Sequence, residues 1–139
     1  FMGQPGRSSM SSYRLNEAGG VDLITAAAAA PGQTAACWVV VTRDGRFAYI
    51  SNTGSDTLTG YHVARNGALS LIDADAVSAR TGAGSGPTDM ALTRNSRFLF
   101  TLNPANGTLS SFGVGPRGRL TPLALVGGIP ASATGLVAR

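Results

Sequence analysis

Hydrophobic and polar positions alternate along this chain in short runs, which turn-forming residues separate. Residues 36–42 form a continuous apolar run with β-branched side chains, which predicts a strand buried on both faces. Residues 46–52 and 57–64 are rich in aromatic and β-branched residues and predict two further strands. An Arg-Asn-Gly turn at residues 65–67, typical of β-hairpins, leads into a fourth strand over residues 68–73. The pattern therefore predicts a unit of four short antiparallel strands.

The same unit occurs twice. TRDGRFAYISNTGSDTL at residues 42–58 returns 51 positions later as TRNSRFLFTLNPANGTL at residues 93–109, and the register continues without a gap to residue 120. Identical pairs include Arg43/Arg94, Arg46/Arg97, Phe47/Phe98, Asn52/Asn103 and Gly67/Gly118. Four antiparallel strands that repeat every 40–50 residues or so are typical of β-propeller blades. The sequence predicts an all-β fold, a propeller section with two complete four-stranded blades and partial blades at both ends.

We interpret the chain as a single partial propeller domain over residues 1–139. Its expected parts are the outer strands of a partial blade (1–30), a blade (36–75), a second blade (87–127) and the inner strand of a last blade (130–139). Residues 10–15 and 21–25 match the third and fourth strands of the unit, whereas the alanine run at 26–30 is interpreted as a loop between blades. Because a closed propeller needs about four to eight blades, we expect a piece of a longer protein. Assembly of several copies into one ring is the alternative.

Composition narrows the classes of partner. The formal net charge is +4, and all eleven basic residues are arginines. Four of them recur in phase with the repeat beside the first turn of each unit, which favours a scaffold or solvated turn over a stripe for nucleic acid. No hydrophobic run reaches the length of a membrane-spanning helix. We therefore expect neither nucleic acid nor a membrane as a partner, and the compartment is not indicated.

Conventional catalytic groups are sparse. The single histidine, His62, falls on an outer strand, where we expect a surface position, and a Ser-His-Asp triad would need it. The single cysteine, Cys37, lies in an apolar strand, where we expect a buried inert thiol. One histidine and one cysteine are too few for a zinc site, so the sequence predicts no metal and no cofactor. Asn52 and Asn103 occupy the same place in both units, and we interpret them as turn residues that bond backbone.

The candidate site is inferred from the positions of loops in the expected propeller. Small-molecule sites in propellers gather at the end of the channel that is lined by the loops entering each inner strand and the loops between second and third strands. Here those loops hold the substrate-binding candidates Trp38, Asp56, Arg80 and Asp89. Asp89 replaces Trp38 of the first unit and so breaks the repeat. Arg80 and Asp89 are also the catalytic candidates, Arg80 to bind an anionic substrate and Asp89 to orient water or a hydroxyl. A carboxylate that caps loop amides is the alternative role for Asp89.

A family resemblance follows from the repeated motif. CWVVVTRDGRFAYISNTG at residues 37–54 and RFLFTLN at 97–103 resemble the repeating pattern of the seven-bladed propeller lactonases, the relatives of bacterial 6-phosphogluconolactonase and fungal carboxymuconate-lactonising enzyme. GIPASATGL at 128–136 resembles the C-terminus of one bacterial branch. The resemblance implies that the chain is the last third of a longer parent protein, with the remaining blades of that protein as its partner. The last blade, whose inner strand is expected at residues 130–138, would then be closed by a strand from the N-terminus of the parent protein.

The implied activity is hydrolysis of a sugar lactone of the 6-phosphogluconolactone type, so that a lactone or sugar acid would be the small-molecule partner. Water would attack the ring carbonyl, with a general base and cations that stabilise the oxyanion. The catalytic positions of the family find no match in these residues. A non-catalytic propeller that binds a protein or carbohydrate ligand is the alternative function, favoured by the lack of a well-placed histidine or glutamate. An inactive fragment is a third possibility, because two blades alone expose unpaired strand edges and are expected to aggregate or to be marginally stable.

Overall fold

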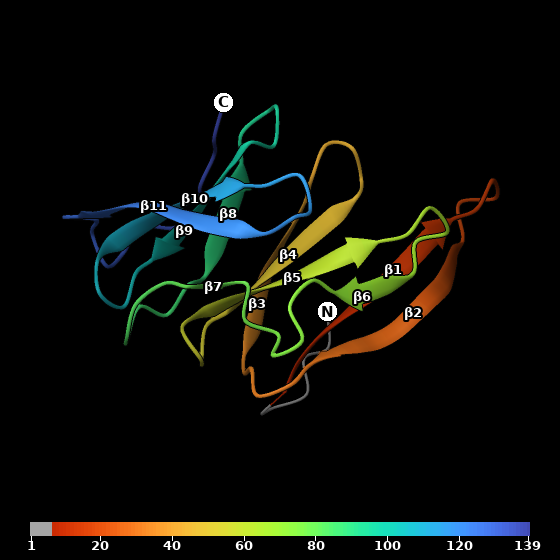
Figure 1. Ribbon diagram of the computed structural model, residues 1–139, viewed down its shortest axis with the longest axis horizontal. Helices are drawn as coiled ribbons and strands as arrows, with labels where there is room; N and C mark the ends of the chain where they lie inside the picture. The colour runs from red at the N-terminus through yellow and green to blue at the C-terminus, as the bar shows by residue number, and fades with distance from the viewer. Residues whose placement is uncertain (1–6) are drawn as a thin grey trace.

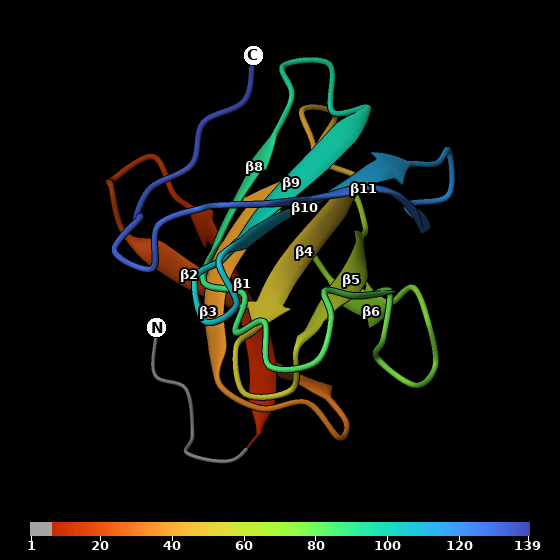
Figure 2. The same ribbon diagram turned by 90° about the vertical axis from the view of Figure 1, so that its left-hand side faces the viewer.

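The computed structural model describes residues 7–139, and all the regular structure in that range is β-strand (Figure 1). The strands are β1 (Ser8–Leu15), β2 (Val21–Ala30), β3 (Ala36–Val41), β4 (Phe47–Asn52), β5 (Thr57–Val63), β6 (Leu69–Leu71), β7 (Ala79–Arg80), β8 (Asp89–Leu92), β9 (Phe98–Asn103), β10 (Thr108–Val114) and β11 (Leu120–Gly127). They form three antiparallel sheets, which Figures 1 and 2 show packed side by side. The predicted all-β propeller section is confirmed.

Each predicted unit forms one sheet. The first blade has the order β3-β4-β5-β6, and the two-residue strand β7 also pairs with β5. The second blade has the order β8-β9-β10-β11, and β1 pairs with β2 in the partial blade that precedes both. Residues 1–6, the start of the expected partial blade, lie outside the described residues.

A repeated side-chain turn joins the first two strands of each blade. The Thr42 hydroxyl donates to the Asp44 carboxylate at 2.7 Å, and the same carboxylate accepts the Arg46 N–H at 3.1 Å. In the second blade the Thr93 hydroxyl donates to the Asn95 side-chain oxygen at 2.9 Å. A carboxylate and an amide oxygen can both accept such local bonds, which explains why Asp and Asn alternate at this position of the repeat.

Blades pack through apolar side chains from both faces of the first blade. Its face toward the second blade contributes a cluster of Phe47, Tyr49, Leu58 and Ala79 with Met90, Leu99 and Phe112. Its opposite face packs Ile50 and Tyr61 against Met10 and Ala30 of the partial blade. Each face also has a polar bond between blades, since the Tyr49 hydroxyl donates to Gly118 O at 2.7 Å and the Tyr61 hydroxyl to Ala28 O at 3.0 Å. Burial raises the pKa of Tyr61 to about 12 and raises that of Tyr49 further.

We expect Tyr49→Phe to lower the free energy of unfolding of the parent protein by about 1–3 kcal/mol, because the buried Gly118 carbonyl loses its partner. Tyr13→Phe is the matched control, since Tyr13 is 58% exposed. Denaturant unfolding of both variants measures the difference, and equal midpoints would contradict a stabilising bond between the blades.

Two strand predictions were wrong. The alanine run at 26–30 is not a loop, because β2 continues to Ala30 and pairs with β1 as far as Ser8. Alanine has low β-propensity, so the sequence carried no signal of this pairing. Residues 36–42 are not buried on both faces, since most of β3 is exposed, including Cys37. β3 contacts β8 on one side, whereas the partial blade contacts the first blade through β2 and β6, and Ala36 of β3 packs against the cluster that holds Met10 and Ala30. His62 is exposed, as predicted.

The last segment follows β11 without pairing as a strand. The Ile129 N–H donates to Gly107 O at 2.9 Å, and residues 137–139 lie beside Arg94, at the opposite end of the second blade. This segment therefore runs along the second blade from one end to the other, in the direction that an inner strand of a further blade would take. The inner strand expected over residues 130–139 stays a prediction, because no strand among residues 7–139 is hydrogen-bonded to this segment.

Candidate functional site

The loops predicted to surround the channel mouth lie together at one end of the blades. The Thr53 N–H donates to Ala35 O at 3.0 Å, which joins the loop between β4 and β5 to the loop that enters β3. The Thr53 hydroxyl donates to Pro87 O at 2.7 Å, which joins it to the loop that enters β8. Gly86 in that loop lies against Ala105 in the loop between β9 and β10. The four loops thus form one continuous rim.

Asp56 holds the loop at residues 82–86 in place. Its carboxylate accepts the Gly84 N–H at 2.7 Å, the Gly86 N–H at 2.8 Å and the Ser85 hydroxyl at 3.2 Å. The Gly86 N–H bond, followed by those of Gly84 and Ser85, holds the pKa of Asp56 below its usual range despite partial burial. Asp56 therefore performs the loop-capping role considered for Asp89, because its carboxylate binds three consecutive residues of the glycine-rich loop, Gly84, Ser85 and Gly86.

Because the pKa of Asp56 is lower in the folded protein, its contribution to stability is fully present above the unfolded value of about 3.9. It is lost as the pH falls through the lower folded value. We expect Asp56→Asn to remove this part of the acid destabilisation and to speed amide exchange at Gly84 and Gly86 at neutral pH. Hydrogen exchange at pH 6–7 measures the loop directly, and unchanged protection at both glycines would show that the carboxylate does not hold it.

Asn52 and Asn103 each connect the second strand of a blade to the third through side-chain hydrogen bonds. The Asn52 side-chain N–H donates to the hydroxyls of Thr57 at 3.1 Å and Thr59 at 2.9 Å. Asn103 donates in the same way to Thr108 at 3.1 Å and Ser110 at 2.8 Å. The prediction that these asparagines bond backbone was wrong. The signal was present in the repeat, where hydroxyl residues recur five and seven positions after each asparagine.

A buried polar group that the sequence did not indicate supports the same rim. The side-chain oxygen of Gln33, which is 7% exposed, accepts the Ser55 hydroxyl at 3.1 Å and also the Thr57 hydroxyl. Gln33 thereby connects the loop that enters β3 to Thr57, which also accepts a hydrogen bond from Asn52. A lone glutamine in a loop carries no periodic signal, so only the tertiary structure shows this role.

Asp89 is the first residue of β8, at the rim end of an inner strand. It is 7% exposed, and its Oδ1 atom is buried without a hydrogen-bond partner among residues 7–139. The side-chain oxygens of Asn52 and Asn103 are likewise buried without a partner in this part of the chain, and a buried oxygen without a donor is costly. Trp38 occupies the equivalent position on β3, the neighbouring inner strand, and is 48% exposed. Asp89 and Trp38 therefore stand at the rim ends of neighbouring inner strands.

Arg80 lies elsewhere. It is exposed on β7 and lines a groove of about 300 Å³ with Phe112 and residues 122–125 of β11, near the outer edge of the second blade. Phe112 packs toward the first blade, as does Met90. Side chains alternate along a strand, so Asp89, next to Met90, lies on the opposite face of this sheet. The two catalytic candidates thus lie on opposite faces of the sheet.

Among residues 7–139, no three His, Cys, Asp or Glu side chains gather in a way that could hold a metal ion. The same part of the chain has no helix with the length and hydropathy to cross a membrane.

The repeated four-stranded sheets and the rim of loops at one end of them define a section of a β-propeller. The profile of the family "Lactonase, 7-bladed beta-propeller" matches residues 8–131. The chain belongs to this seven-bladed propeller lactonase family. No curated protein sequence matches the chain.

Solved structures share the fold. A protein from Lactobacillus plantarum superposes with a TM-score of 0.71 at 22% identity, over 89% of this chain and 37% of that one. The periplasmic gluconolactonase of Pseudomonas aeruginosa gives a TM-score of 0.71 at 20% identity, over 91% of this chain and 38% of that one. A candidate 6-phosphogluconolactonase of Bacteroides fragilis gives 0.65 at 19% identity, over 86% and 37%. The chain spans little more than a third of the length of each.

Proposed function

We propose that the parent protein of these blades hydrolyses a sugar lactone, of the 6-phosphogluconolactone type, at the loop end of its channel. The observation that carries this proposal is membership of the lactonase family over residues 8–131. The shared fold with a periplasmic gluconolactonase supports it. So does Asp89, at the rim end of an inner strand, whose Oδ1 atom has no hydrogen-bond partner among residues 7–139.

In the proposed reaction, water loses a proton to the base and adds to the lactone carbonyl carbon, the ring C–O bond breaks, and the base returns the proton to the alkoxide oxygen to give the hydroxy acid. Asp89 is the residue of this chain suited to orient that water and accept its proton, since a general base needs a free acceptor within hydrogen-bond reach. Trp38 supplies an exposed aromatic surface at the rim end of the neighbouring inner strand, against which a sugar ring can pack. The cations that stabilise the oxyanion would come from the other blades, because Arg80 lies across the sheet from Asp89.

The test is acid release in a pH-stat by the parent protein with glucono-δ-lactone and with 6-phosphogluconolactone, each corrected for spontaneous hydrolysis. We expect saturable turnover of at least one lactone. Rates equal to the blank for both lactones would contradict the proposal. Saturable binding of the sugar acids at those blank rates would instead establish the non-catalytic, carbohydrate-binding propeller.

A further inference from the structure

The opposite end of the blades carries a second concave surface, which we call the turn groove. It has a volume of about 510 Å³ and lies between the first turns of the two blades and the last turn of the second. Its lining residues are Thr42, Arg43, Asp44, Arg46, Phe47, Asn95, Ser96, Arg97, Val114, Gly115 and Pro116. It shares no residue with the rim loops or with β8, so it is separate from the candidate site around Asp89.

The turn groove has an excess of positive charge. Arg43, Arg46 and Arg97 line it, and Asp44 is the only carboxylate among its lining residues. Bonds from the Thr42 hydroxyl and then from the Arg46 N–H lower the pKa of Asp44. This carboxylate is therefore already used within its own turn. Its contact with the Arg46 guanidinium is loose, at 4.0 Å between exposed groups, and neutralises that cation weakly.

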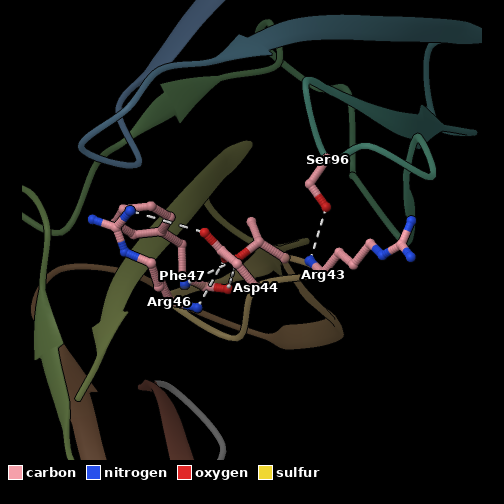
Figure 3. Close-up of polar contacts among 6 residues, drawn as sticks. Arg43, Asp44, Arg46, Phe47 and Ser96 are labelled. Atoms are coloured by element: carbon pink, nitrogen blue, oxygen red, sulfur yellow. Dashed lines mark hydrogen bonds and ion pairs between the residues drawn. The ribbon is translucent and has the colours of Figure 1, made fainter. Parts of the chain in front are cut away.

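One of the arginines is held against a neighbouring side chain. The Arg46 guanidinium carbon lies 5.2 Å from the centre of the Phe47 ring, within the range of a cation–π contact. Phe47 in turn is buried and lies 5.1 Å from the His62 ring. Figure 3 shows the Arg46 side chain beside this ring, with the Asp44 carboxylate between it and Arg43. Less side-chain entropy is lost on binding when a cation is already positioned in this way.

Ser96 fixes the two turns relative to each other. It stands where the first unit has Gly45, and both have a positive φ, of 55° at Ser96 and 69° at Gly45. A serine pays a conformational cost in this region that glycine does not. Its hydroxyl accepts the Arg43 N–H at 2.8 Å, across the boundary between the blades (Figure 3). Ser96, where the sequence departs from the repeat, thus forms a bond that holds Arg43 close to the turn that carries Arg97.

We propose that the turn groove binds a small oxyanion, a phosphate or carboxylate group of a small molecule, through the guanidinium groups of Arg43 and Arg97, with Arg46 adding positive charge on the other side of Asp44. Guanidinium groups bind both kinds of oxyanion through paired N–H donors. The volume of the groove fits a small organic ligand. The arginines recur in the repeat as turn residues, but the packing of adjacent blades brings three of them into one groove, which their separate positions in the sequence do not show.

The test is isothermal titration of the parent protein at low ionic strength, with inorganic phosphate in one arm and malonate in the other. We expect saturable binding in at least one arm, weakened about tenfold or more by Arg43→Gln and by Arg97→Gln. Arg65→Gln is the matched control, because it removes the same charge from an exposed turn outside the groove. Ser96→Gly should weaken binding without lowering the melting temperature, since it removes the bond to Arg43 and the conformational cost together.

The preference between phosphate and malonate identifies the oxyanion. Binding weakened equally by Arg65→Gln would show an effect of overall charge and overturn the proposal. Absence of saturable binding in both arms would also overturn it. Circular dichroism of each variant confirms that the fold is intact, which is expected because all three substituted arginines are exposed.

Discussion

Replacing Gly118 by alanine will lower the free energy of unfolding of the parent protein by about 2–5 kcal/mol. Gly118 has a φ of +77°, and an added Cβ atom would lie 2.4 Å from Phe47 Cδ1 and 2.8 Å from Ile72 Cδ1. These two side chains belong to the first blade, so the clash is at the interface between the blades. The Gly118 carbonyl also accepts the Tyr49 hydroxyl, and any backbone shift that relieves the clash disturbs this buried bond.

Gly45→Ala separates the two causes. Gly45 has a φ of +69°, but an added Cβ atom would meet nothing within 4 Å. It should therefore cost only the backbone term, about 1–2 kcal/mol. Denaturant unfolding of the two variants gives the comparison. Equal losses of stability would mean that the blades do not pack as closely at Gly118 as the structure shows.

Asp89→Asn in the parent protein will reduce kcat/KM for the lactone by about 10²- to 10⁴-fold, the range lost with a general base. An amide fills the same volume but cannot take a proton from water. Because Asp89 Oδ1 has no hydrogen-bond partner within the described chain, the substitution breaks no observed bond there. The melting temperature should change little.

Asp75→Asn is the control for Asp89. Asp75 is an exposed carboxylate whose Oδ1 atom accepts the Val77 N–H at 3.1 Å, a bond that the asparagine oxygen can keep. We expect wild-type activity from this variant. If Asp89→Asn keeps full activity but lowers stability, Asp89 has a structural role only and the proposed base must lie on another blade.

The repeat made most of the fold predictable. An apolar strand, a turn with Asp or Asn, and an aromatic strand recur in register, and the two sheets follow them. Some residues that contact a neighbouring blade could also be recognised, because they are identical in the two units. Gly67 and Gly118 each have a positive φ and lie against an isoleucine of the preceding blade, Ile24 and Ile72 respectively. Local sequence showed that these glycines recur, and only the packing shows why.

The site was harder to predict. The repeat shows which positions are equivalent in the two units, but it does not show which side chains of neighbouring blades meet. Asp56 was grouped with Asp89 by loop position, yet its carboxylate is used by the amides of residues 82–86. Arg80 was placed at the rim, but β7 pairs with the start of β5 and sets Arg80 on the outer groove. The face of the sheet on which a side chain lies at a strand end depends on strand pairing between residues far apart in the sequence. The amino-acid composition does not show this pairing.

The most direct test of the proposed site is a crystal structure of the parent protein with the sugar acid product bound. The account predicts that the product lies at the loop end of the channel, packs against Trp38, and has an oxygen within hydrogen-bond reach, about 2.6–3.2 Å, of the Asp89 carboxylate. Product bound elsewhere, with Asp89 enclosed between blades and out of reach, would contradict it.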